Sequence, residues 1–182
     1  MTIENLIKKC AKNDRKAQGE LFRRYKDALY LTSLKYCRNQ EEAEDNLHDS
    51  FLVIFQKIET FKSLGSFEGW MKRITIFKAI DTYKAKKTIS VEINDDLLED
   101  VIIDETFCDL PLDDLLQLIQ GLPDQYRLIF NLYQLDDYTH KEIARMLGIS
   151  ENTSKSNYHR AKIHLRKKIL DTMPHLNYKT KN

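Results

Sequence analysis

Cationic and hydrogen-bonding side chains gather near the C-terminus at a spacing that suits DNA. They are Lys155, Ser156, Asn157, His159, Arg160 and Lys162. Lysine and arginine attract phosphates, and serine, asparagine and arginine match the hydrogen-bonding groups of base edges. Before them come a short amphipathic segment that Thr139 can cap, then Gly148, which can turn the chain with positive φ. This pattern predicts a helix-turn-helix, and the alternative is a basic solvated helix in an ordinary bundle.

A second group surrounds the short segment 61–67. It combines the aromatic Phe61 and Phe67 with the polar Lys62, Ser63 and Ser66. Aromatic rings beside cations and hydroxyls suit an unstacked base and its phosphate. The segment that follows carries six lysines and arginines, which adds to the attraction for phosphates. Aromatic residues at helical spacing are more often part of a core, and this is the interpretation that composition favours for Trp70.

A third group is acidic and lies within residues 41–50. Asp45 and His48 are three residues apart, with Glu44 and Asp49 beside them. The arrangement resembles half of a carboxylate-bridged metal site in a helical bundle, which would need further ligands from facing helices. We expect no metal ion and no cofactor, and we interpret the acidic face as one that binds a basic partner.

Other function classes find no support in the sequence. There is no phosphate-binding glycine loop, no G-x-S-x-G and no H-E-x-x-H, so we expect no enzyme. The cysteines, Cys10, Cys37 and Cys108, form no C-x-x-C pair and predict neither a thiolate zinc site nor a disulfide framework. No run of about 18 apolar residues is present, and the first residues lack the features of a secretory signal, so we expect a cytoplasmic protein.

The elements that must position these groups are predicted to be helices. Few glycines and prolines, 5 and 3 in 182 residues, favour long elements with sparse turns. Apolar periodicity predicts four helices with one modest core in the first half, over 3–10, 14–36, 39–60 and 67–87. In the second half we expect helices over 112–121, 124–133, 139–148 and 150–170.

Charge divides the chain into three parts, although the net charge is only +1. Residues 88–126 contain eleven acidic residues and no lysine or arginine, whereas 1–87 and 127–182 are both basic. Two basic blocks on either side of an acidic stretch predict two polyanion-binding units joined by a linker.

Two stretches of the sequence resemble regions two and four of bacterial sigma factors. The first runs from AQGELF to AIDTYK and contains E-A-E-D, D-S-F and W-x-x-R-I. The second begins at GLPDQYR and contains E-I-A-x-x-L-G-I-S-x-x-T-x-K-S followed by R-A. Their order, with only a short acidic linker between them, resembles the extracytoplasmic-function (ECF) group.

The resemblance implies an all-α fold with two small helical domains and no catalysis of its own. The expected parts are a region-two domain over 1–87, an acidic linker over 88–111, a region-four helix-turn-helix domain over 112–173 and a tail over 174–182. Such a protein binds core RNA polymerase, melts the −10 promoter element with region two and binds the −35 element in the major groove with region four. An anti-sigma factor is a further partner that the family suggests.

The resemblance also implies roles for individual residues. Core polymerase would bind Asp45, His48, Asp49 and Phe51. The −10 element would meet Lys62, Ser63, Leu64, Ser66, Phe67, Trp70, Lys72, Arg73 and Phe77. The −35 element would meet the group from Lys155 to Lys162. The sequence departs from the common family pattern at four of its positions. In the first stretch, Phe77 stands where many relatives have Asn, and His48 stands where Gln is more frequent. In the second stretch, Ser154 stands where many relatives have Val, and Asn152 stands where many have Gly.

A hypothesis from another class stays open at this point. A helix-turn-helix repressor or activator, with an N-terminal unit that senses a ligand or dimerises, would share the C-terminal pattern. A pull-down with core polymerase separates the two hypotheses, because a repressor need not bind the enzyme stoichiometrically.

Overall fold

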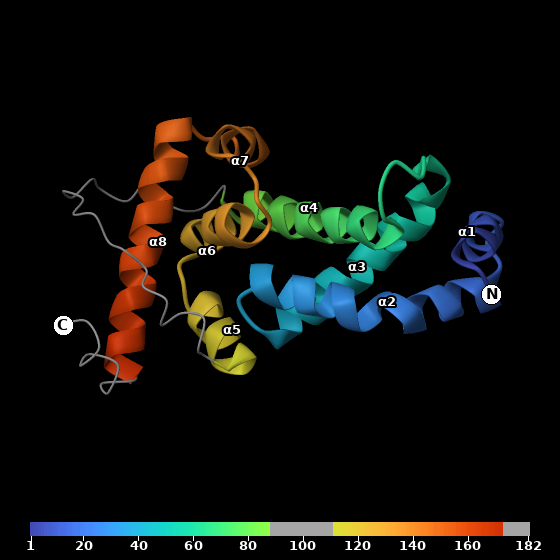
Figure 1. Ribbon diagram of the computed structural model, residues 1–182, viewed down its shortest axis with the longest axis horizontal. Helices are drawn as coiled ribbons and strands as arrows, with labels where there is room; N and C mark the ends of the chain where they lie inside the picture. Colours follow the sequence, from blue (N-terminus) through green and yellow to red (C-terminus); the bar gives the residue numbers. More distant parts are fainter. Residues whose placement is uncertain (88–110, 173–182) are drawn as a thin grey trace. The chain divides into compact units, whose positions relative to one another are not determined.

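The computed structural model describes residues 1–87 and 111–172, and the regular elements within these ranges are helical (Figure 1). The chain divides into two compact units, residues 1–82 and 83–182. The predicted all-α fold with two helical domains is therefore confirmed. Most of the acidic linker and the C-terminal tail lie outside the described residues, and both stay predictions.

The first unit contains four α-helices and one short 3₁₀ turn. Its elements are α1 (Ile3–Ala11), α2 (Arg15–Tyr36), α3 (Gln40–Lys57), η1 (Ile58–Thr60) and α4 (Phe67–Lys87), the last of which ends just beyond the unit. A polar side chain accepts a hydrogen bond from a backbone N–H in the first turn of each α-helix, and the four acceptors are Thr2, Asp14, Asn39 and Ser66. These bonds satisfy N–H groups that a helix leaves without an internal partner, which explains where each helix begins.

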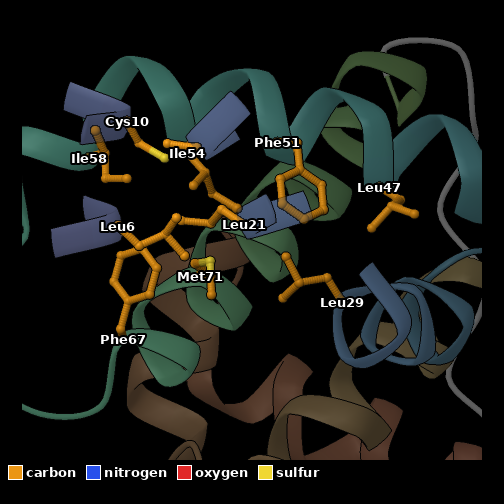
Figure 2. Packing of buried hydrophobic residues seen from close by; sticks show 11 residues of the cluster. Leu6, Cys10, Leu21, Leu29, Leu47, Phe51, Ile54, Ile58, Phe67 and Met71 are labelled. Atoms are coloured by element: carbon orange, nitrogen blue, oxygen red, sulfur yellow. The ribbon is translucent and has the colours of Figure 1, made fainter. Parts of the chain in front are cut away.

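One hydrophobic core joins these helices (Figure 2). Leu6 and Cys10 from α1 meet Ile54 from α3 and Met71 from α4, and all four side chains are fully buried. Because α3 turns its apolar stripe into this core, its acidic residues are exposed to solvent.

A small polar cluster inside the first unit fixes α3 against its neighbours. The Asn46 amide nitrogen donates to the Ser33 hydroxyl of α2 at 3.0 Å and to the Thr75 carbonyl of α4 at 3.3 Å. All three residues are buried. Hydrogen bonds of this kind are directional, so they restrict how α3 can slide or rotate against α2 and α4.

The second unit is also helical within its described residues. Its elements are α5 (Leu112–Gln120), α6 (Asp124–Phe130), η3 (Asn131–Leu135), α7 (His140–Leu147) and α8 (Glu151–Thr172). The predicted single helix over 124–133 is wrong only over its last three residues. The α-helix ends at Phe130, and η3 is a π-turn in which the Asp136 N–H donates to the Asn131 carbonyl at 3.1 Å. The wider turn buries Asn131 and Leu132 while the next three side chains are exposed.

A buried arginine holds the turn between α5 and α6. Arg127 is 3% exposed, and its guanidinium donates to the carbonyls of Gln120 and Leu122 at 3.2 and 2.9 Å and to the Asp124 carboxylate at 2.6 Å. The Gln120 carbonyl belongs to the last residue of α5, where the helix itself supplies no donor, and the Leu122 carbonyl belongs to the turn that follows. Arg127 therefore acts as a side-chain cap for this turn.

We expect Arg127→Met to destabilise the second unit selectively. The substitution keeps an apolar stem but removes all of these bonds, and breaking a buried charged pair costs about 3 kcal/mol of unfolding free energy. Urea unfolding followed by circular dichroism should show an earlier transition for this unit. Trp70, the only tryptophan, lies in the first unit, so its fluorescence transition should stay in place.

The control is Arg145→Met, because Arg145 is exposed on α7. Equal stability of the two variants would show that Arg127 does not hold the turn.

Candidate nucleic-acid interface

Three aromatic rings form a platform beside the loop 61–66 of the first unit. The ring centroid of Phe61 lies 5.0 Å from that of Phe67 and 5.6 Å from that of Trp70. Phe67 and Trp70 are stacked at 5.5 Å with 20° between their planes. Phe67 is buried, while Phe61 and Trp70 are half-buried. The platform is anchored in the core and still has partly accessible rings.

The loop itself is anchored at both ends and exposed between them. The Phe61 N–H donates to the Ile58 carbonyl at 3.3 Å, and Ser66 caps α4 through the Gly69 N–H at 3.0 Å. A Cβ at Gly69 would lie 2.9 Å from the Ser66 hydroxyl, so a larger residue here would force this hydroxyl to shift. Gly65 has φ 119°, a value that favours glycine, and Leu64 beside it is 89% exposed. The loop therefore presents an apolar side chain to solvent.

The structure places most of the predicted −10 residues on the surface of this region. Lys62, Ser63, Leu64 and Ser66 are exposed, as is Arg73, whereas Trp70, Lys72 and Phe77 are half-buried. Phe67 is 7% exposed and belongs to the core, so its assignment to a DNA-facing position is corrected. Phe77 stands where many relatives have Asn. The centroid of its ring lies 5.6 Å from the Arg73 guanidinium, so the ring makes a cation–π contact with this arginine.

The acidic face of α3 presents three of its four predicted residues. Asp45 and His48 are exposed, and the half-exposed Asp49 pairs with Lys78 of α4 at 3.0 Å. The prediction for Phe51 disagrees with its burial, since the ring is 3% exposed and lies 4.7 Å from Phe22 in the core.

Leu52 takes the place on the acidic face that the prediction gave to Phe51. Its side chain is 60% exposed, one helical turn beyond His48. The spacing of positions 45, 48, 49 and 52 on one helical face was the signal that could have identified it.

The helix-turn-helix of the second unit has the predicted local geometry. Thr139 and Glu142 form a reciprocal capping box at the start of α7. Gly148 has φ 68°, as the turn required, and the Thr153 N–H donates to the Ser150 hydroxyl at 3.0 Å to begin α8. The turn and both caps are thereby confirmed.

One face of α8 carries most of the predicted −35 residues. Lys155 is exposed, and Ser156, His159, Arg160 and Lys162 are half-buried. Asn157 is 6% exposed, so its assignment to base reading is corrected. It lies on the packed stripe with Ser154, Ala161 and Leu165, which are buried at the 3–4 residue spacing of a helix face.

A partly buried hydrogen bond joins α7 to α8. The His140 Nδ1 and the Ser154 hydroxyl are 2.9 Å apart, and Ser154 is fully buried. The His140 ring also stacks on Tyr133 at 4.1 Å with 11° between the planes. The serine that replaces a common valine therefore has a polar partner, a histidine fourteen residues earlier. Sequence reasoning missed this pair, although both residues lie within the predicted motif.

The surroundings of the His140 imidazole lower its pKa. Burial lowers the pKa of His140 below its usual value of 6.5, Lys155 lowers this pKa further, and Glu151 partly opposes the shift. The pKa of His164 is also lowered, first by burial of the ring and then by the positive charges of Lys168 and Lys167. At a pH between the folded-state and unfolded-state pKa of these histidines, the unfolded chain binds more protons than the folded chain. The free energy of unfolding therefore rises with pH in this range.

We expect the second unit to lose stability as the pH falls below about 6.5. The double variant His140→Phe with Ser154→Val keeps an aromatic ring and an apolar packing partner but removes the titrating group, so its loss should be smaller. Thermal unfolding at pH 7.5 and pH 5.5 measures both losses. As a control, His164→Gln is added to the wild type and to the double variant, because His164 titrates in the same range. If the loss of stability between the two pH values were the same with and without His140, the pH dependence could not be assigned to His140.

The two described ranges, 1–87 and 111–172, contain neither a grouping of potential metal ligands nor a membrane-spanning helix. Within them, no three His, Cys, Asp or Glu side chains are grouped so that they could hold a metal ion. None of the described helices combines the length and apolar composition that a membrane crossing requires.

Two family models match the chain, one for each unit. Sigma-70 region 2 matches residues 21–89, and Sigma-70, region 4 matches residues 112–165. The chain is 29% identical over 184 residues to the ECF RNA polymerase sigma factor SigW of Bacillus subtilis, which covers 94% of this chain and 98% of the relative. It is 29% identical over 153 residues to the ECF RNA polymerase sigma factor SigE of Mycolicibacterium smegmatis, which covers 81% of this chain and 59% of the relative.

A solved structure shares the fold at low sequence identity. The sigma factor RpoE of Bartonella quintana, crystallised in complex with the anti-sigma factor NepR, gives a TM-score of 0.51 at 17% identity and covers 82% of this chain and 94% of that chain. The matches to both regions and to curated relatives agree with the helix-turn-helix geometry. The chain belongs to the ECF RNA polymerase sigma factors, the non-enzymatic initiation factors that direct RNA polymerase to promoters.

Proposed function

We propose that this sigma factor uses three surfaces: the loop 61–66 with α4 for the −10 element, α8 for the −35 element, and the acidic face of α3 for core RNA polymerase. We assign region two to residues 1–87 and region four to residues 112–173. The observation that carries the proposal is the helix-turn-helix, in which Gly148 joins a capped α7 to the cationic face of α8. The match of the first unit to sigma-70 region 2 disfavours the repressor alternative.

The −35 element is read by the exposed side of α8 in the major groove. We assign Lys155, Ser156, His159, Arg160 and Lys162 to this contact and leave the buried Asn157 out. Lys155 is exposed at the first turn, the part of a recognition helix that approaches base edges. The cations supply affinity for phosphates, and Arg160 can bind a guanine edge in bidentate fashion.

The −10 element is opened at the loop 61–66. Extracting a base from the stack costs a few kcal/mol, and a rigid apolar site can return part of this energy. The anchored aromatic platform and the exposed Leu64 offer such a site next to Lys62 and Arg73. We propose that Leu64 contacts the extruded base or its former neighbour.

Leu64→Asp is expected to impair promoter opening more than duplex binding. The carboxylate would repel nearby phosphates and cannot replace an apolar contact, and a loss of about 1.4 kcal/mol corresponds to about tenfold. Fluorescence of 2-aminopurine in the −10 element measures opening, and a filter-binding assay on closed duplex at low temperature measures binding. Leu64→Met should retain opening, and equal losses in both assays would remove this role from the loop.

Core polymerase binds the acidic face of α3. Asp45, His48 and Asp49 lie on this face, and Leu52 adds an exposed apolar side chain beside them. Carboxylates favour a basic partner surface and repel DNA, which keeps the polymerase surface distinct from the DNA surfaces.

Asp49→Lys should weaken holoenzyme assembly while leaving the fold intact. Reversing an interface charge creates like-charge repulsion and, because Asp49 pairs with Lys78, also removes an ion pair that contributes little to stability. Fluorescence anisotropy with core polymerase should show at least about tenfold weaker binding. The matched control is Asp27→Lys, an 89% exposed acid on α2. Equal affinities of the two variants would contradict the docking surface.

Run-off transcription with core polymerase on a promoter library tests the function as a whole. The full chain should produce specific start sites that depend on both promoter elements. Failure to direct any start site would overturn the proposal. We also propose that the protein works in the cytoplasm, where RNA polymerase meets the chromosome, and that an anti-sigma factor regulates it, as the complex of RpoE with NepR suggests.

A further inference from the structure

Five cations surround the turn between α1 and α2, and we call them the basic corner. They are Lys8, Lys9, Lys12, Arg15 and Lys16, and all five are exposed. The family match to region 2 begins at residue 21, so the basic corner lies outside the matched segment. The surfaces proposed above do not use these residues.

The five cations of the basic corner outnumber the two acids of residues 1–16, Glu4 and Asp14. None of the five forms an ion pair within the described part of the chain, whereas Arg24 pairs with Glu20 and Lys72 with Glu68 at 2.6 and 2.7 Å. Asp14 lies in the corner, but its carboxylate accepts the backbone N–H groups of Lys16 and Ala17 as the cap of α2. A concentration of positive charge therefore remains available to an external partner.

The basic corner is held in a fixed position within the same unit as the loop 61–66. Leu6 and Cys10 on the opposite side of α1 are fully buried in the core shared with Ile58 and Phe67. Helix α1 packs against η1, and the chain passes from η1 directly into the loop 61–66 (Figure 1). The turn is itself hydrogen-bonded, with the Asp14 N–H donating to the Lys9 carbonyl at 3.1 Å.

The composition of the basic corner fits nucleic acid better than protein. Protein interfaces are depleted in lysine and enriched in aromatic residues, and four of the five charges here are lysines with no exposed large apolar side chain among residues 8–16. A phosphate backbone, by contrast, needs only accessible cations. A strand that leaves the −10 loop would have unpaired bases, and its phosphates are a polyanion that this unit would meet.

We propose that the basic corner binds phosphates of the single-stranded promoter DNA adjacent to the −10 element. This inference rests on the assignment of the −10 element to the loop 61–66. It adds an electrostatic contact that stabilises the opened strand without reading its sequence.

The test uses holoenzyme assembled from core polymerase and the variant Lys8→Gln with Lys12→Gln. The probe is a fork DNA that carries the −10 element and a single-stranded extension next to it. Each lost contact to single-stranded phosphate should reduce the salt slope of log K by about 0.7. The same fork without the extension should bind wild type and variant alike.

Two further variants make the result specific. Arg23→Gln with Lys26→Gln removes two charges from exposed residues of α2 and should leave the slope unchanged. Lys8→Arg with Lys12→Arg should restore it. An unchanged slope in the glutamine variant, or an equal loss in the α2 control, would overturn the proposal.

Affinity for core polymerase is measured in parallel. A loss of core affinity with an unchanged slope would assign the basic corner to polymerase instead and would also overturn the proposal. Start-site selection by the wild-type holoenzyme does not depend on these comparisons. The failure of this proposal is therefore distinguishable from failure of the sigma-factor function.

Discussion

The rotation of each helix about its axis depends on which face it buries, and this rotation decides what each helix can bind. A helix places residues three and four positions apart on the same side, so one buried stripe fixes the direction of every other residue. In α3 the stripe that contains Phe51 and Ile54 turns Asp45, His48 and Leu52 outward. In α8 the stripe that contains Ala161 and Leu165 turns Lys155 outward in the same way. Hydrophobic packing therefore selects which residues form both the proposed polymerase surface and the proposed −35 surface.

Apolar packing alone would leave some freedom of sliding, and buried hydrogen bonds reduce it. Asn46 fixes α3 against α2 and α4, Arg127 closes the turn after α5, and the bond from His140 to Ser154 joins the two helices of the DNA-binding motif. Each of these bonds is directional and lies in a poorly solvated place, where a mismatched arrangement would leave a polar group without a partner. Precise placement matters most for the proposed role of α8, which is to enter a groove of fixed width.

Local sequence signals predicted the helix starts because caps act over three or four residues. Ser66, Thr139 and Gly148 needed no knowledge of distant contacts. The errors lie where tertiary packing decides. Asn157 is polar and looked like a base reader, but the helix packs that side, and Phe51 was assigned to a surface although its own periodicity placed it in the core. The π-turn after Phe130 could not be predicted from periodicity, because one residue more in a turn changes the phase of the pattern.

Burial also separates the cations that hold the fold from those that can bind DNA. The Arg127 side chain is 4% exposed in its pair with Asp124, so breaking this pair would leave a desolvated charge at a cost of several kcal/mol. Lys72, Lys78 and Lys155 pair with acids at 32–56% exposure, where an ion pair contributes at most about 1 kcal/mol. A phosphate can therefore replace Glu68 as the partner of Lys72, or Glu151 as the partner of Lys155, at little cost. At the proposed DNA surfaces, such an exchange of partners requires no change in the core that positions the helices.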